Sequence, residues 1–137
     1  MELTVEATGH EHVTATHGST FEVTTDDYLT PSGDCILGVA ADTAPAAFPP
    51  EFVAACRDAD ATIAVTFEAG GYADSVVGRG DPALSFDSDR SLVGRTSTHV
   101  DDRTAMVEAG KAAADLDRDL VAALADGAAL RCTLEVS

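Results

Sequence analysis

The chain has 137 residues, of which 45% are hydrophobic and 5% aromatic, and its 24 acidic against 8 basic residues give a formal net charge of −16. The length predicts one domain, residues 1–137, and the lack of a long apolar run or of a signal-peptide pattern argues against a membrane-spanning or secreted protein. The acids are interspersed with apolar residues and form no block, so we expect a folded cytoplasmic protein adapted to high salt, which screens the repulsion between its charges.

The N-terminal part of the chain predicts strands. Between residues 3 and 23 the apolar residues fall on odd positions and the polar residues on even ones, which is the period of a strand with one buried face. His17 and Ser19 share the parity of Phe21, so we expect both side chains to point inward. After a turn-rich loop, the apolar run at 35–41 predicts a short strand buried on both faces.

The rest of the chain predicts further strands and two helices. A short helix follows the prolines of 43–60, and strands with hairpin turns are expected within 62–79 and 83–100. A long helix is predicted from about residue 104 to residue 126, with a glycine at its end, and the strand 130–136 closes the chain.

These elements predict an α+β fold. Most of it is antiparallel β-sheet, which can curl into a partly closed barrel, with one long C-terminal helix packed on it. We find no internal repeat, no low-complexity segment and no domain linker in the sequence.

The histidines and cysteines suggest two possible chemical roles, a metal site and a nucleophilic thiol. His10, His12 and His17 are three of the four histidines, but no second cluster of ligands at metal spacing supports a zinc site, so no metal is predicted. Cys35 could act as a nucleophile with His17 as its base. The alternative, which we favour, is an inert thiol at the start of an apolar strand.

The inward side of the predicted strands suggests a polar cavity. A buried imidazole or hydroxyl needs a partner, so His17 either bonds a backbone carbonyl near Gly18 or has a functional role, and both alternatives remain open. Asp34 lies at the mouth of a strand. Arg95 shares the parity of the apolar Val93, and an inward guanidinium requires carboxylates or an anionic ligand.

The predicted C-terminal helix places further charges near that cavity. At 100° per residue Asp117 falls in the middle of the apolar arc, so we expect it to be buried, unless the helix bends at Gly110. Lys111, the only lysine, and Arg118 lie on one flank with Asp115 between them. They form either a surface ion-pair ladder or the rim of an anion site.

Several sequence blocks occur together in one order: GH, TH.ST.E.T, LT..GDCI.GV, G.GDPAL, R.S and KAA.DLDR. Over nearly the whole chain this combination resembles an archaeal family with a domain of unknown function. The resemblance implies an archaeal, specifically haloarchaeal, cytoplasmic protein and supplies no mechanism. Two positions depart from the family pattern, namely His12 in place of an amide residue and Gly110 in place of an acidic one. The shared blocks include His10, His17, Thr20, Glu22, Asp34, Cys35, Asp81, Arg95, Ser97, Lys111, Asp115 and Arg118.

We therefore predict a polar cavity for a small anionic or phosphorylated molecule, in an enzyme of the hydrolase or transferase class. The predicted catalytic residues are His17, as acid or base, Asp34, Lys111 and Asp117. The predicted ligand-binding residues are Ser19, Thr20, Asp81, Arg95, Ser97 and Arg118. The sequence identifies no cofactor and no oligomeric state.

The rival hypothesis is a binding module for RNA or a ribonucleoprotein, in which Arg79, Arg95, Lys111 and Arg118 would contact phosphates. The 5% aromatic content with no tryptophan gives little support for base stacking. A third hypothesis is a structural subunit. Basic residues on one open face would favour RNA, and their convergence in a concave pocket would favour a small ligand.

Overall fold

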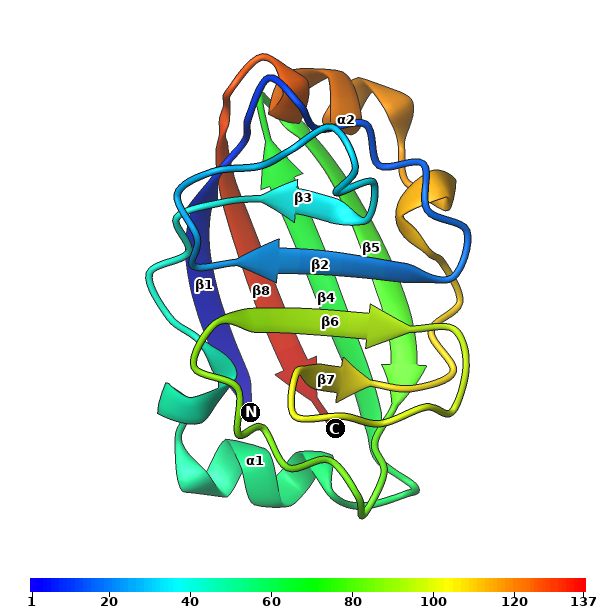
Figure 1. Ribbon diagram of the computed structural model, residues 1–137. Coiled ribbons are helices and arrows are strands. Elements are labelled where there is room, and N and C mark those ends of the chain that lie inside the picture. The colour runs from blue at the N-terminus through cyan, green and yellow to red at the C-terminus, as the bar shows by residue number, and fades with distance from the viewer.

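Eight strands form two four-stranded sheets in the computed structural model, which describes residues 1–137 (Figure 1). The strands are Glu2–Thr8 (β1), Thr20–Thr24 (β2), Ile36–Gly38 (β3), Thr62–Ala69 (β4), Tyr72–Arg79 (β5), Ser91–Arg95 (β6), Thr104–Met106 (β7) and Ala129–Val136 (β8). The first sheet has the order β1-β8-β4-β5, and all its neighbours are antiparallel. The second sheet has the order β3-β2-β6-β7, with an antiparallel central pair and parallel outer pairs.

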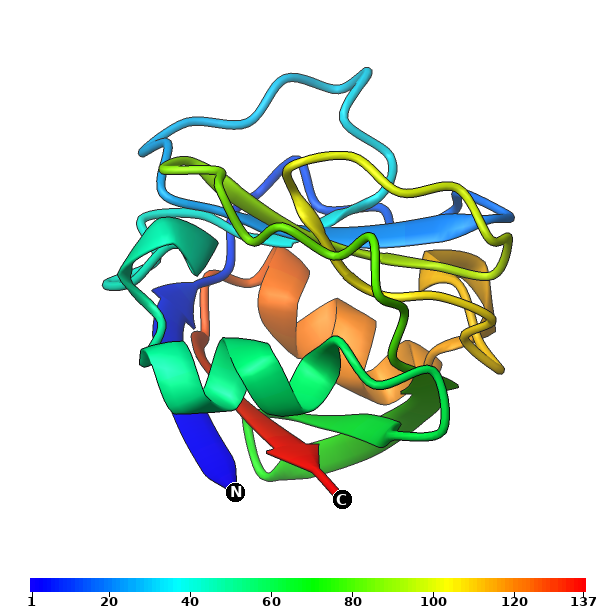
Figure 2. The same ribbon diagram turned by 90° about the horizontal axis from the view of Figure 1, so that it is seen from below.

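The two sheets pack face to face, and the strands of the second cross those of the first at a steep angle (Figure 1). Helix α1 (Pro50–Cys56) and helix α2 (Arg118–Ala125) lie at opposite ends of this sandwich and cover its open ends (Figure 2). A 3₁₀ turn precedes each helix: η1 (Pro45–Ala47) and η2 (Ala113–Asp115). No helix is both long enough and apolar enough to cross a membrane.

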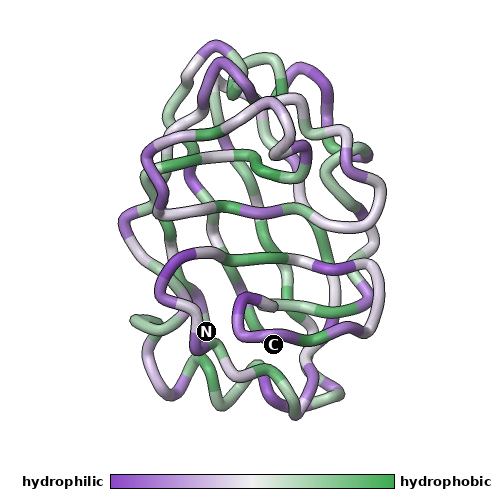
Figure 3. The backbone as a smooth tube through the Cα atoms, in the orientation of Figure 1, coloured by the Kyte–Doolittle hydropathy of each residue, from purple (hydrophilic) through white to green (hydrophobic).

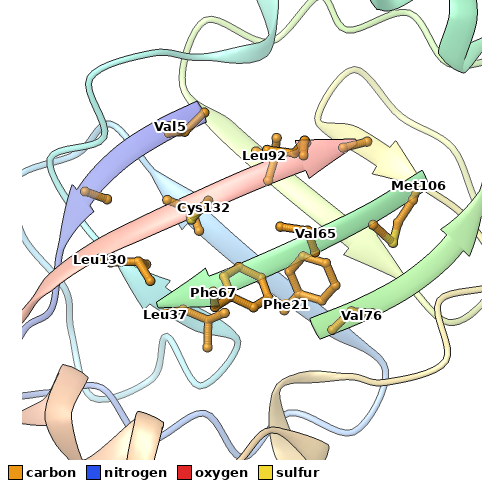
Figure 4. Close-up of a cluster of buried hydrophobic side chains, with 14 of the residues drawn as sticks. Val5, Phe21, Leu37, Val65, Phe67, Val76, Leu92, Met106, Leu130 and Cys132 are labelled. Atoms are coloured by element: carbon orange, nitrogen blue, oxygen red, sulfur yellow. The ribbon is translucent and has the colours of Figure 1, made fainter. Parts of the chain in front are cut away.

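The core lies between the sheets and consists of one cluster of 33 buried residues. Phe21 of β2 and Phe67 of β4 meet edge to face at its centre, with ring centroids 5.3 Å apart (Figure 4). Gly94 permits this contact, because a Cβ atom there would lie 2.1 Å from the Phe21 ring. Hydrophobic positions follow the strands, whereas hydrophilic positions lie mainly in the loops at the periphery (Figure 3).

The predicted α+β class with mainly antiparallel sheet is confirmed, but the sheets do not form a closed barrel. Single backbone bridges, Thr8–Val39 and Arg79–Val107, link the edges of the two sheets. They join the layers at two corners only, because β3 and β7 are three residues long and cannot continue the pairing.

The prediction of a long helix at 104–126 is wrong. Residues 104–106 form β7 beside β6, and Glu108 has a positive φ of 51°, which ends regular structure there. The helix starts only at Arg118, after the 3₁₀ turn. The apolar spacing that suggests one helix is thus produced by a strand, a turn and a short helix, each with its own buried residues.

The two halves of the chain have the same fold, so the absence of an internal repeat is also a wrong prediction. The order of three strands, a 3₁₀ turn, a helix and a strand occurs in residues 2–69 and again in residues 72–136. The positive-φ residues Ala15 and Ala40 recur as Phe86 and Glu108. A pseudo-two-fold axis therefore passes between β4 and β8 in the first sheet and between β2 and β6 in the second.

Sequence comparison misses this repeat because few side chains are shared and the spacing changes. Ala15 and Phe86 are 71 residues apart, whereas Ala40 and Glu108 are 68 apart, since the loop before β7 is shorter than the loop before β3. The identical run Val-Ala-Ala at 53–55 and 121–123, within the two helices, is the clearest remaining trace.

The repeat makes two glycines equivalent and equally intolerant of a side chain. A Cβ at Gly9 would lie 2.1 Å from the Leu124 carbonyl oxygen, and one at Gly80 would lie 2.2 Å from that of Cys56. We predict that Gly80→Ala lowers the free energy of unfolding by about 1–3 kcal/mol, because backbone must move. Gly18→Ala, at a position with open space around it, serves as the control and should change it little. Equal effects of the two variants in chemical denaturation would contradict the close approach.

Candidate functional site

The largest group of half-buried charges lies on the outer face of the second sheet, the face turned away from the core. Its members are Glu22 on β2, Arg95 at the end of β6, and Asp101 and Arg103 in the segment before β7. Their side chains are 14%, 11%, 30% and 42% exposed, respectively. We call these four residues the polar network.

Asp101 is the centre of the polar network. Its Oδ2 accepts from Nη2 of Arg95 at 2.8 Å and from Nη2 of Arg103 at 3.1 Å. Its Oδ1 accepts from the Arg103 backbone N–H at 3.0 Å and from the Thr104 hydroxyl at 3.1 Å. Burial alone would raise the pKa of Asp101, but these hydrogen bonds and the two guanidinium charges lower it well below its usual range. Two arginine side chains therefore converge on one carboxylate oxygen.

Glu22 is held much less firmly than Asp101. Its Oε1 lies 3.8 Å from Nη1 of Arg103 and accepts a weak hydrogen bond from Sγ of Cys35 at 3.6 Å. Glu22 thus enters the polar network as a carboxylate with spare acceptor capacity.

Cys35 is not an activated nucleophile. Burial, and after it the charge of Glu22, raises the pKa of the Cys35 thiol to about 11. The group therefore stays protonated near neutral pH, which weakens the hypothesis of a thiolate with His17 as its base. The thiol acts here as a weak hydrogen-bond donor to Glu22.

The first half of the repeat shows which residues occupy the positions equivalent to the polar network. The bond from the Ile36 N–H to the Gly33 carbonyl in the first half corresponds to that from Thr104 to Asp101 in the second. In the first half this corner is apolar: Gly33 packs beside Ile36 and Leu29, and a Cβ on it would meet Leu29 at 2.5 Å.

A second correspondence concerns Glu22 itself. The Glu22 N–H donates to the Cys35 carbonyl, as the Val93 N–H donates to the Arg103 carbonyl, so Glu22 and Val93 are equivalent positions. They also pair with each other across the axis. The same scaffold therefore folds with uncharged residues, namely Gly33, Cys35 and Val93, at the positions equivalent to Asp101, Arg103 and Glu22.

The prediction that His17 and Ser19 point into a core is wrong. Residues 10–19 are not a strand, Ser19 is exposed and His17 is half-buried. Nδ1 of His17 accepts the backbone N–H groups of Ser19 at 3.2 Å and Thr20 at 3.1 Å, and contacts the Thr20 hydroxyl at 3.1 Å. In the other half the Ser88 hydroxyl accepts two N–H groups in the same way. His17 therefore caps the start of β2.

The predicted site residues on the N-terminal side lie near one another without forming a cavity. The Asp34 carbonyl accepts the His17 N–H at 3.1 Å, and the Ser19 carbonyl accepts the Thr96 N–H at 3.0 Å. Thr20 pairs with Arg95 across the central strands of the second sheet. A catalytic role for Asp34 stays a prediction.

Two other predicted ligand-binding residues, Ser97 and Asp81, accept local backbone hydrogen bonds. Ser97 is exposed, and its hydroxyl accepts the His99 N–H. Asp81 accepts the Ala83 N–H in a turn after β5.

Lys111 and Asp117 meet at Asp74 of β5. Nζ of Lys111 lies 2.5 Å from Oδ1 of Asp74, and the Asp117 N–H donates to Oδ2 at 2.9 Å. Burial opposes ionisation of Asp74, but these bonds lower its pKa. The prediction of a buried Asp117 is wrong: it is the exposed N-cap of α2 and accepts the Asp119 N–H. Of the two alternatives for Lys111, Asp115 and Arg118, the ion-pair ladder is absent, because no helix spans the three residues.

All eight basic side chains already have partners in the structure. Six bind carboxylates: Arg79 with Asp81 and Glu108, Arg90 with Asp26, Arg95 and Arg103 with Asp101, Lys111 with Asp74, and Arg131 with Glu6. The other two, Arg57 and Arg118, donate to backbone carbonyls. No open face of free cations results.

The surface depressions lie elsewhere. One of about 340 Å³ and another of about 460 Å³ meet at Gly70 and Tyr72, in the hairpin between β4 and β5. The first contains the ion pair of Glu6 with Arg131, and the second is lined by α2. Neither contains a predicted site residue. The polar network is instead a surface of half-buried groups, and its convergent charges make it the better candidate.

The histidine pair does not form a metal centre of known type. The rings of His10 and His12 lie 5.3 Å apart, and Nδ1 of His10 accepts the His12 N–H. No group of three or more His, Cys, Asp or Glu side chains is arranged to hold a metal ion.

Sequence reasoning missed Asp101 and Arg103. The signal available was the segment Asp-Asp-Arg-Thr at 101–104, in which an aspartate can cap a turn two and three residues ahead. The prediction of a long helix from about residue 104 obscured this turn signal. Recognising 104–106 as a strand would have placed both side chains beside Arg95.

We predict that Asp101 makes the free energy of unfolding fall more steeply as the solution is acidified. Its folded pKa is lowered relative to roughly 4 in the unfolded chain, so its contribution is present above pH 4 and is lost as the pH falls below that value. The free energy of unfolding of Asp101→Asn should therefore fall less steeply than that of the wild type between about pH 5 and pH 2. Asp102→Asn, at the exposed neighbour, is the control. Identical slopes in all three proteins would refute the effect.

We predict that His17 stabilises the folded protein by capping the start of β2. His17→Ala should lower the free energy of unfolding by about 1 kcal/mol, since two N–H groups lose their acceptor. His17→Ser should retain most of it, because Ser88 performs this role in the other half. If serine is no better than alanine in denaturant titrations, the capping role is disproved.

The comparisons agree with the archaeal resemblance. The chain is 39% identical over 127 residues, 93% of either chain, to the uncharacterized protein MJ0206 of Methanocaldococcus jannaschii. The family model described as a domain of unknown function, DUF371, matches residues 5–137, which include both halves of the repeat and the whole polar network. The protein therefore belongs to the DUF371 family.

Proposed function

We propose that the polar network binds a small molecule through a carboxylate or a similar singly charged anionic group. The observation that carries this proposal is the convergence of Arg95 and Arg103 on one oxygen of Asp101, at 2.8 and 3.1 Å. Guanidinium groups recognise planar oxyanions in this way. Arg103 is 42% exposed, so it can offer N–H donors to a ligand from solvent while Asp101 keeps it oriented.

The repeat supports a functional origin for these charges. A half-buried ion pair is seldom more stabilising than apolar packing of the same volume. The first half fills the equivalent corner with Leu29, Gly33 and Ile36, so the fold does not require ions there. The presence of two arginines and two acids at this position therefore supports a role in recognition.

Binding has better support than catalysis. Of the four predicted catalytic residues, His17 caps a strand, Asp117 caps a helix and Lys111 is paired with Asp74. An enzyme of the hydrolase or transferase class would have to use the polar network itself, with Glu22 as the remaining half-buried base. We therefore propose ligand binding as the function.

The RNA-binding alternative has less support. The basic side chains form no open cationic face along which a polyanion could lie, and the net charge of −16 repels a polyanion except at high salt. The same excess of acid over base favours a cytoplasm rich in salt as the place where the protein works.

The test is a titration of wild type, Arg103→Gln and Arg90→Gln in high-salt buffer with acetate, malonate, succinate, inorganic phosphate and a short RNA. Arg90 is a matched control, since it is a surface arginine bound to a single carboxylate, Asp26. We expect a carboxylate to raise the melting temperature of wild type and Arg90→Gln, and to bind Arg103→Gln at least about tenfold more weakly.

Three outcomes would contradict the proposal. The first is no response to any carboxylate, and the second is an equal response in all three proteins. The third is a response to RNA alone, which would favour the RNA-binding hypothesis instead.

A further inference from the structure

Glu22 is the least satisfied charged group in the polar network. The carboxylate is 14% exposed, yet its contacts are a thiol at 3.6 Å and a guanidinium nitrogen at 3.8 Å. A side chain this little exposed normally has more hydrogen-bond partners in the protein, and the open acceptor positions of Glu22 face solvent, since no buried side-chain oxygen lacks a partner. Asp101, which shares Arg103 with Glu22, accepts four.

The fold does not account for a carboxylate at this position. Val93 is the equivalent residue in the other half, and it pairs with Glu22 across the pseudo-two-fold axis. Valine is a good strand residue and needs no partner. An acid on β2 is therefore a departure from the repeat that packing does not explain.

We propose that Glu22 binds the ammonium group of a zwitterionic ligand, so that the ligand of the polar network is an amino acid or a close relative. This inference rests on the proposed function, because the carboxylate of the same ligand would bind Arg103. The two groups of an α-amino acid are close neighbours, as are Glu22 and Arg103, whose Oε1 and Nη1 lie 3.8 Å apart.

Charge balance supports a zwitterion over a phosphorylated ligand. Glu22 and Asp101 carry two formal negative charges, and Arg95 and Arg103 carry two positive ones. A ligand with one positive and one negative group leaves this balance unchanged. A doubly charged phosphate would have to sit beside two carboxylates, which like-charge repulsion disfavours.

Because the contact between Glu22 and Arg103 is weak, a ligand can bind to both side chains without breaking a hydrogen bond between them. The ligand ammonium becomes a hydrogen-bonded partner of Glu22, and the ligand carboxylate, beside it, accepts from Arg103 N–H groups that make no hydrogen bond to Glu22. No proton transfer and no covalent step is involved. Cys35, a protonated thiol, remains as a neighbour of Glu22.

The test compares amino acids with the same acids lacking the amino group, in high-salt isothermal titration. Aspartate is paired with succinate, and leucine with 4-methylpentanoate, on wild type, Glu22→Gln, Glu22→Val and Arg103→Gln. The valine variant copies Val93 and is expected to fold. We expect wild type to bind at least one amino acid about tenfold or more tightly than its deaminated partner, and both Glu22 variants to lose that preference.

The outcomes distinguish a failure of the zwitterion proposal from a failure of anion binding itself. If the acids with and without an amino group bind wild type equally and Arg103→Gln abolishes both, the zwitterion is disproved while anion binding stands. If neither kind binds, or if Arg103→Gln binds as wild type does, both proposals fail. A preference for the amino acid that persists in Glu22→Gln and Glu22→Val would overturn the role of Glu22.

Discussion

The fold depends on the pairing of strands from opposite halves of the chain. In the first sheet β8 of the second half lies between β1 and β4 of the first, and β4 in turn pairs with β5 of the second. In the second sheet β2 pairs with β6. Neither half can bury its own apolar faces, so each becomes stable only when the other covers it. The shared core and the two helices at the ends of the sandwich follow from this exchange.

The exchange also explains why the candidate site lies where it does. The central pair of the second sheet brings Glu22 beside Val93 and Thr20 beside Arg95, and the parallel neighbours add the segments that precede β3 and β7. Four chain segments thus meet on one outer face. Duplication supplies equivalent positions there, and different side chains at those positions turn one corner apolar and the other ionic. This asymmetry between the halves is the basis of the proposal that the ionic residues serve recognition.

Several features could be predicted from single residues. Strands β4 and β8 follow the alternation of their apolar residues, and α1 follows a proline at its first turn. Arg95 was expected to point inward and to need a carboxylate; it lies on the outer face of the second sheet, which corrects the first expectation, and Asp101 provides the carboxylate. His17 was expected either to serve a backbone partner or to act chemically, and it accepts N–H groups where a carbonyl had been considered. The wrong predictions share one cause: parity and helical phase were carried across Gly9, Gly18 and Glu108, where the backbone changes direction.

The sequence by itself determined the class of the fold, the acidic character and the family, because periodicity, charge and motif order are properties of local stretches of chain. Only the tertiary structure decided that the chain is a repeat, that Asp117 is exposed and that Arg95, Arg103, Asp101 and Glu22 adjoin. Those facts depend on the register between strands far apart in the chain. Register is fixed by the joint burial of both halves, and no single segment contains that information.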